Sequence, residues 1–239
     1  MDSVGLGGVR KAFTFELCAE TVEACEAARL GGADRIELCV HLKVDGLTPP
    51  QEMIARAVAD SGLRVHVLVR PEADDFRYRR EVFARMRAEV VRAKELGAAG
   101  VVAGVLNEDR TVAVEAMREL VELAAPLPVE FHRAFDRTPD LCRALEDVIA
   151  AGCGRVLTSG GAADVMEGAA ALSGLVRQAA GRIEIAAGGG LRVENAGRLA
   201  AMCPGLHYHG TLGGAADGVD ALAGRVRQVV AALRAAAAS

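Results

Sequence analysis

The chain has 239 residues, of which 51% are hydrophobic and 25% are charged, and its net charge at pH 7 is −4. This composition is that of a globular protein with a large apolar core. The acidic balance, with only 3% aromatic residues, argues against a nucleic-acid-binding protein, which needs a basic surface and rings on which bases stack.

Short β-branched segments alternate with longer helical segments along the whole chain. The predicted strands lie at 13–18, 35–40, 64–70, 100–106, 128–134, 155–160, 183–188 and 206–211. The predicted helices lie at 21–30, 80–96, 115–125, 140–151, 166–180, 194–202 and 219–236, with another that begins at Pro49. Thr48 and Thr138, each followed by proline, are the expected N-caps of the helices that come after them.

Strands that alternate with helices form a parallel sheet, and eight such units close naturally into a barrel. Barrels of this kind commonly fold as one unit of about 250 residues. We therefore predict an α/β protein with a single TIM-barrel domain, a (β/α)8 barrel, over residues 1–239. Its strands occupy about 12–211 and its final helix 219–236. A doubly wound open sheet is the structural alternative, although no GxGxxG motif follows the first strand.

Each predicted strand has one apolar face, which must pack on helices, so its other face points into the barrel. The inward positions include four glutamates and four histidines: Glu16, Glu37, Glu130, Glu184, His66, His132, His207 and His209. Buried charge is costly unless it is paired. Residues at strand starts are therefore expected to form an ion-pair network on the barrel floor, with Arg35 and Arg64. Residues at strand ends are the candidates for function, because TIM-barrel sites lie at that end.

Motifs at the strand ends resemble those of the copper homeostasis protein CutC family. They are FELCAET, GADRIELC, DGLTPP, FHRAFD and RVLTSG, in this order, and they extend from Phe15 to about Thr211. The resemblance implies a TIM barrel and a cytoplasmic role in copper handling. The positions that it singles out are Cys18, Glu37, Cys39, Arg70, His132, Arg133, Asp136, Thr158, Ser159 and His209.

Copper binding is the first functional hypothesis. Cys18 and Cys39 end neighbouring predicted strands on the inward face, so their sulfur atoms are expected to approach one another. Thiolates are ligands that Cu(I) prefers, and a histidine such as His66 or His209 is able to complete the site. The alternative interpretation is that both are buried cysteines that act as small apolar residues.

An enzyme that acts on a small phosphorylated or carboxylated metabolite is the second hypothesis. The expected anion-binding residues are Arg70, Arg133, Thr158, Ser159, Gly189 and Gly190. The expected acid–base residues of an isomerase, epimerase or lyase are Glu37, His66, His132, Asp136 and His209. A third possibility is a zinc or manganese site built from His66, His132, His209 and Glu37. Whether the chain is an enzyme stays open at this stage.

Compartment and partners follow from what the sequence lacks. No segment has the roughly 18 uncharged apolar residues of a membrane span, and residues 1–13 lack the apolar run of a signal peptide. The six cysteines show no CxxC spacing and are expected to be reduced thiols. We therefore expect a cytoplasmic protein with a metal-ion or small-molecule ligand, no nucleic-acid or membrane partner, and a homodimer as one possible assembly.

Overall fold

The computed structural model describes residues 13–214, 216 and 218–238, so the predicted absence of a signal peptide falls almost wholly outside the described residues. Its strands are β1 (Phe15–Ala19), β2 (Arg35–Leu38), β3 (Arg64–Leu68), β4 (Gly100–Ala103), β5 (Val129–Phe131), β6 (Arg155–Thr158), β7 (Glu184–Ala187) and β8 (His207–Gly210). Its α-helices are α1 (Val22–Gly31), α2 (Gln51–Asp60), α3 (Arg80–Glu95), α4 (Val114–Ala124), α5 (Leu141–Ala150), α6 (Ala169–Ala179), α7 (Val193–Met202) and α8 (Val219–Ala237).

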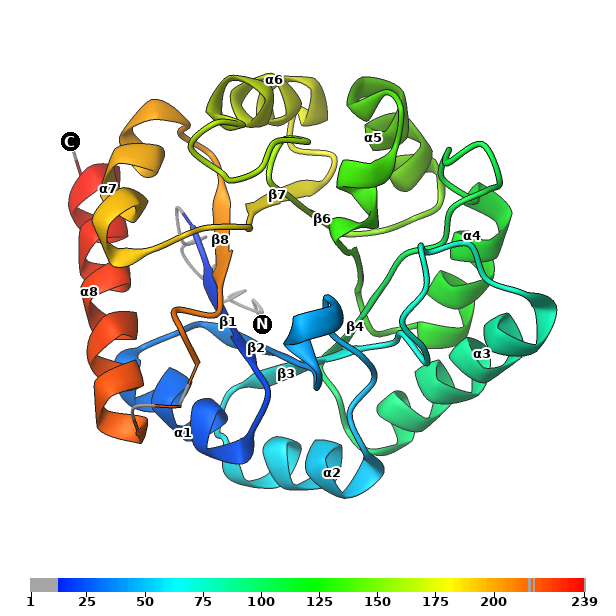
Figure 1. Ribbon diagram of the computed structural model, residues 1–239, viewed down its shortest axis with the longest axis horizontal. Coiled ribbons are helices and arrows are strands. Elements are labelled where there is room, and N and C mark those ends of the chain that lie inside the picture. The colour runs from blue at the N-terminus through cyan, green and yellow to red at the C-terminus, as the bar shows by residue number, and fades with distance from the viewer. Residues whose placement is uncertain (1–12, 215, 217, 239) are drawn as a thin grey trace, which may run out of the picture.

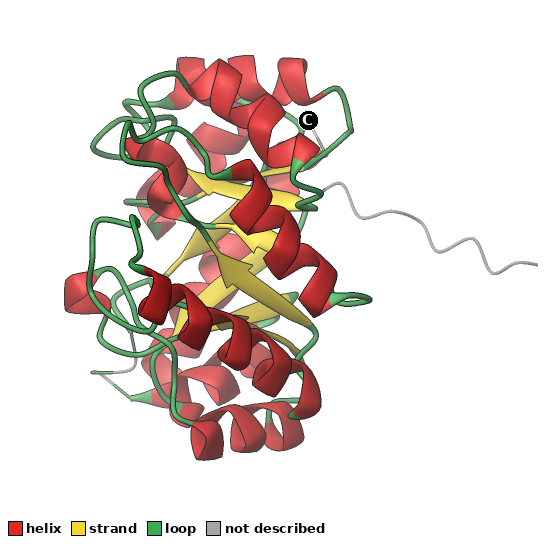
Figure 2. Ribbon diagram, turned by 90° about the vertical axis from the view of Figure 1, so that its right-hand side faces the viewer, coloured by secondary structure: helices red, strands yellow, loops and turns green. Residues whose placement is uncertain are grey.

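The strands form one closed parallel barrel in chain order, and the helices surround it as an outer ring (Figure 1). The pairing of Glu16 with His209 brings β1 beside β8 and closes the barrel. Outside the closure, α8 packs against both α1 and α7. The predicted TIM barrel is confirmed, and the long loops that follow the strands gather on one side of it (Figure 2).

The two predicted threonine caps are wrong. Thr48 donates its hydroxyl to Glu89 and accepts from the Arg70 amide, and α2 begins after Pro50 without a side-chain cap. Asp140 caps α5 by accepting from the Cys142 and Arg143 amides. Thr48 is engaged by tertiary partners, which local capping patterns do not contain. Thr138 instead donates its hydroxyl to the carbonyl of Phe135 and leaves the cap to its near neighbour Asp140.

The outward faces of the strands carry the apolar core, as their alternation predicts. Phe15, Leu17, Ile36 and Leu38 are fully buried in one cluster that continues into the helices. The opposite faces of β1 and β2 point into the barrel and carry charged side chains. Among the described residues, no helix has the length and apolar character required to cross a lipid bilayer.

The barrel floor is a buried ion-pair network, as predicted, but with a different arginine. Arg35 contacts both Glu16 and Glu130, and all three side chains are almost fully buried. Arg155 lies 2.9 Å from Glu184 and 3.7 Å from Glu130, whereas Arg64 is exposed. Arg155 is at the start of β6, whose two faces cannot be told apart by apolar pattern alone.

His66 fills the middle of the barrel and depends on a glycine in the next strand. A Cβ atom added to Gly100 would overlap the His66 ring, whose two nitrogens have no partner among the described residues. Burial, with Arg35 nearby, lowers the pKa of His66 to about 3, so the ring is neutral at pH 7. The neutral ring therefore fills space in the barrel interior, below the open end of the barrel.

Gly100→Ala is therefore expected to destabilise the protein by about 1–3 kcal/mol, because the added methyl overpacks the barrel centre. Urea unfolding followed by circular dichroism measures the change. Gly154→Ala is the matched control, because a Cβ atom there meets nothing within 4 Å. Equal stabilities of the two variants would contradict this account of His66.

Candidate functional site

A cavity of about 1110 Å³ opens at the carboxyl ends of the strands, bounded by the loops that follow β1, β2, β3, β5, β6, β7 and β8. The residues expected from sequence that line it are Cys18, Glu37, His132, Arg133, Asp136, Gly189, Gly190 and His209. Those that do not line it are Cys39, His66, Arg70, Thr158 and Ser159. The sequence-based site therefore divides into residues at the cavity wall and residues behind it.

Two thiols meet at the ends of β1 and β2. The Sγ atoms of Cys18 and Cys39 are 3.4 Å apart, and Cys18 Sγ is 3.7 Å from Glu37 Oε1. Parallel pairing places Cys18 beside Glu37, and Cys39 follows on the same face. Leu68 and Val102 pack against the pair. The hydrogen bond with Cys39, then burial and the Glu37 charge, raise the pKa of Cys18 well above its usual value.

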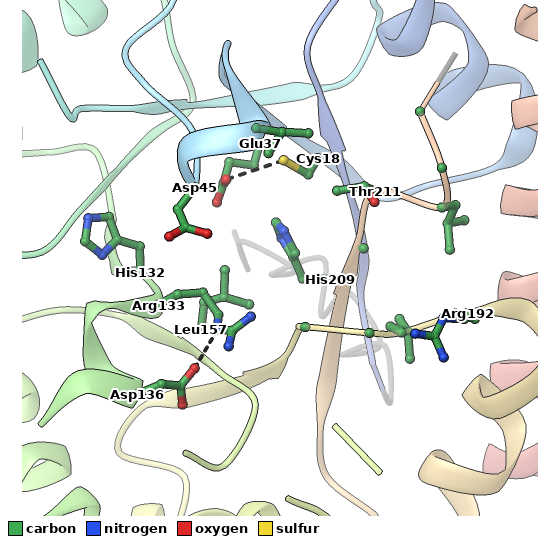
Figure 3. A pocket seen from close by; sticks show the side chains of 18 of the residues that line it. Cys18, Glu37, Asp45, His132, Arg133, Asp136, Leu157, Arg192, His209 and Thr211 are labelled. Atoms are coloured by element: carbon green, nitrogen blue, oxygen red, sulfur yellow. Dashed lines mark hydrogen bonds and ion pairs between the residues drawn. The ribbon is translucent and has the colours of Figure 1, made fainter. Parts of the chain in front are cut away.

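Glu37 is the carboxyl group that faces the cavity from this cluster. The residue is 5% exposed, and Oε2 has no partner among the described residues. Figure 3 shows its carboxyl group pointing into the cavity beside Cys18. Burial raises the pKa of Glu37 to about 7. The group therefore exchanges its proton near neutral pH, and it is able to bind a cation once ionised.

The carbon signal of the Glu37 carboxyl group is expected to titrate with a midpoint near pH 7, measured by ¹³C NMR of glutamate-labelled protein. Because the folded pKa is above the unfolded value of about 4.3, the associated stability is present below pH 4.3 and lost as pH rises through 7. In Glu37→Gln the titrating carbon signal should be absent, and stability should no longer fall as pH rises through 7. A midpoint near 4 in the wild-type protein would show that Glu37 is solvated or paired.

His209 lies next to Glu37 and binds a floor residue. Its Nδ1 is 2.8 Å from Glu16 Oε1, and one ligand atom each from Glu16, Glu37 and His209 lies within 4.8 Å of the others. Burial lowers the pKa of His209, but Glu37 and Glu16 outweigh it and hold that pKa above its usual value. Glu16, Glu37 and His209 together form a second set of metal-compatible donors, with oxygen and nitrogen in place of sulfur.

The predicted three-histidine metal set does not form among the described residues. His66 is inside the barrel, and the His132 ring points away from the centre of the cavity (Figure 3). His132 Nδ1 accepts from the Ala134 amide, and the ring lies tilted against Phe76 with a centroid separation of 5.0 Å. Burial, with Arg70 nearby, lowers the pKa of His132 to about 3. Among the described residues, His209 is the only one of the three that belongs to a group of metal-compatible donors with Glu37.

Arg70 is buried behind the cavity wall and is occupied by backbone. Its guanidinium donates to the carbonyls of Val44, Gly46 and Asp74, and it lies 4.8 Å from the Phe76 ring centre. The side chain thus ties the loop after β2 to the loop after β3. These three carbonyls use donors on both terminal nitrogens, and Nε has no partner among the described residues.

Asp136 is also held by the protein. Its carboxylate accepts from the Thr158 hydroxyl and from the Ser159 and Gly161 amides at 2.5–3.2 Å. Arg133 Nε donates to it at 2.5 Å. Thr158 and Ser159 are therefore used to fix Asp136, and Asp136 in turn fixes Arg133, whose side chain remains 40% exposed at the cavity.

The CutC family matches the chain over residues 13–214. The chain belongs to the CutC family. A CutC family protein of Chromobacterium violaceum is 43% identical over 199 residues, which cover 83% of this chain and 81% of that protein. The human copper homeostasis protein cutC homolog is 38% identical over 205 residues, covering 86% and 75%.

Solved structures agree with this assignment. The CutC crystal structure from Streptococcus agalactiae has a TM-score of 0.79 and 30% identity, and the match covers 83% of this chain and 98% of that one. Thiamine phosphate pyrophosphorylase from Pyrococcus furiosus, at 13% identity and a TM-score of 0.63, shares the fold alone. This CutC family member therefore has the fold that its sequence predicts.

Several residues that line the CutC cavity were not predicted from the sequence. Asp45, Arg192 and Arg225 line it from loops and from α8. No strand alternation reaches these positions, so the sequence carries no local signal for them. Glu16 was predicted only as a residue of the barrel floor, yet it also contacts His209. Its inward-facing position and the pairing of β1 with β8 could have predicted this contact.

Proposed function

We propose that this CutC family member binds Cu(I) through Cys18 and Cys39 and takes part in copper homeostasis in the cytoplasm. The 3.4 Å separation of the two sulfur atoms carries the proposal. Cu(I) is soft and prefers thiolate ligands. One ion is able to touch both sulfurs, since metal–thiolate bonds are about 2.3 Å long in zinc sites. The name of the human relative supports the same role.

Access to the pair is through Cys18. Cys18 lines the cavity, whereas Cys39 is fully buried behind it. An arriving ion thus meets Cys18 and Glu37 first and Cys39 second. Glu37 is the third donor at hand, because its Oε1 is 3.7 Å from Cys18 Sγ and belongs to the same group of metal-compatible atoms.

Anaerobic titration of the reduced protein with Cu(I), in competition with a chromophoric chelator, tests the proposal. One tightly bound ion per chain is expected. Because the pKa of Cys18 is raised, binding must displace a thiol proton, so the affinity should rise with pH. Binding no stronger than that of a protein without paired thiols, or an affinity independent of pH, would contradict the proposal that this protein binds Cu(I) through Cys18 and Cys39.

The second candidate is an enzyme of isomerase, epimerase or lyase type that acts on a small anionic metabolite. The cavity volume of about 1110 Å³ favours it, because metabolite pockets are commonly about 300–1,000 Å³ and a bare ion needs far less. Glu37 and His209 are the side-by-side acid–base groups that it would use. Turnover that survives Cys39→Ser but fails in Glu37→Gln would favour the enzyme.

A further inference from the structure

The charges on the cavity wall are divided between its two sides. The acidic side, after β1 and β2, carries Glu20, Glu37 and Asp45 with the Cys18 thiol. The other side, after β5 and β7 and on α8, carries Arg133, Arg137, Arg192 and Arg225, with Asp136 and Glu194. Figure 3 shows Glu37, Asp45 and Cys18 across the cavity from Arg133. This division suits a ligand with an anionic end.

Arg133 has one open donor group on this wall. Nε donates to Asp136 and Nη2 donates to Ser159 Oγ at 3.2 Å, while Nη1 has no partner among the described residues. A Cβ atom on Gly189 would overlap Nη1 and lie 2.9 Å from Cζ. Only glycine therefore lets the guanidinium lie against this loop, where Asp136 and Ser159 hold it still.

The loop after β7 offers backbone donors beside Nη1. The carbonyl of Gly189 accepts from the Val165 amide at 2.9 Å, and that of Gly190 accepts from Asn195 Nδ2 at 2.8 Å. Within the described residues, the amides of Gly189, Gly190 and Leu191 donate to nothing. All three residues line the cavity. Carbonyls that face the protein leave their N–H groups for a ligand or solvent.

The neighbouring loop shows what such a turn binds. After β6, Gly160 and Gly161 have positive φ angles of 76° and 72°, and this loop accommodates the Asp136 carboxylate on backbone amides. After β7, Gly189 and Gly190 also have positive φ angles, 108° and 76°. Successive glycines of this kind turn amides toward a common anion. The first loop contains the protein's own carboxylate, and the second is open to the cavity.

We propose that Arg133 Nη1 and the Gly189–Leu191 amides form an oxyanion subsite for the phosphate or carboxylate group of a small organic ligand. The rest of that ligand extends toward Glu37, whose unpartnered Oε2 accepts from a hydroxyl or amine or contacts a cation. Loops after strands 7 and 8 commonly hold such groups in TIM barrels. The subsite does not depend on copper, and it gives the second candidate function its ligand class.

Amide NMR of the full-length, metal-free, reduced protein tests the subsite, with inorganic phosphate and malonate as separate probes at constant ionic strength. Saturable shifts are expected at Gly189, Gly190 and Leu191. Arg133→Gln should weaken binding by roughly tenfold or more, because it removes a charge-assisted donor. The probe that binds more tightly decides between phosphorylated and carboxylated ligands.

Arg79→Gln is the matched control, because that side chain is 73% exposed, is paired with Glu72 and lies outside the cavity. It should bind both probes as the wild-type protein does. The absence of saturable shifts in the wild-type protein, shifts confined to other regions, or equal binding by Arg133→Gln would each overturn the subsite. Because no copper is present, these outcomes are independent of the copper titration.

Discussion

Replacing both Cys18 and Cys39 with serine is expected to remove tight Cu(I) binding, lowering the affinity by several orders of magnitude. A serine hydroxyl has nearly the same shape as the thiol but is a hard, weakly acidic oxygen that Cu(I) disfavours. Glu37 and His209 remain in place, so any residual binding reports the oxygen and nitrogen donors alone. The affinity is measured by the same chelator competition as for the wild-type protein.

Cys142→Ser is the matched control, because Cys142 is an exposed cysteine on α5 and is not in either group of metal-compatible residues. It should bind Cu(I) as the wild-type protein does. Retention of tight binding by the double variant would assign the ion to other residues. Loss in the Cys142 variant as well would indicate that binding is not localised to the paired thiols.

Arg35→Met is expected to cause the largest loss of stability, about 3–5 kcal/mol, because it leaves buried glutamates without their cation. Arg35 contacts both Glu16 and Glu130, and each of these side chains is at most 2% exposed. For a chain of this size, the melting temperature should fall by roughly 6–20 °C. Differential scanning calorimetry at neutral pH gives the change directly.

The loss should depend on pH in a defined direction. Burial alone would raise the pKa of Glu16, but Arg35 and His209 hold it well below its usual value. Stability from its ionised form is present above the unfolded pKa of about 4.3 and is lost as pH falls through the lower folded value. The difference between Arg35→Met and wild type should therefore shrink in acid.

Arg79→Met again serves as the exposed comparison, and its effect should stay within about 1 kcal/mol. A small effect of Arg35→Met at neutral pH would mean that Arg155, 3.7 Å from Glu130, and His209, 2.8 Å from Glu16, compensate for the missing cation. An effect that grows in acid would contradict the assigned ionisation of Glu16.

The barrel and its inward-facing residues were predictable because strand alternation is a local property. The parity that turns Phe15 and Leu17 outward also turns Cys18 inward, and parallel pairing with β2 then brings Cys39 to 3.4 Å from it. From the second strand on, the predicted strand ends lie one to three residues beyond the observed ones, because turns begin before the apolar pattern ends, whereas β1 extends one residue past its predicted end.

The roles of Arg70 and Asp136 were not predictable in the same way. Both were expected at the ligand, and both have donors or acceptors taken by loops that fold over them. Asp136 meets Gly161, 25 positions along the chain, only because β5 and β6 are neighbours and their loops are long. Such contacts are set by tertiary structure, and no motif in the sequence separates them from a catalytic pair.

Closure of the barrel by β1 and β8 has a consequence for how the chain folds. Phe15 pairs with Tyr208, so the first strand cannot complete its pairing until the last strand is present. The two residues of this contact are separated by most of the chain. Contacts between such distant segments slow folding and prolong the exposure of strand edges. During synthesis, β1 leaves the ribosome long before β8 exists. A chain that stops before β8 keeps two open edges on which other chains are able to assemble.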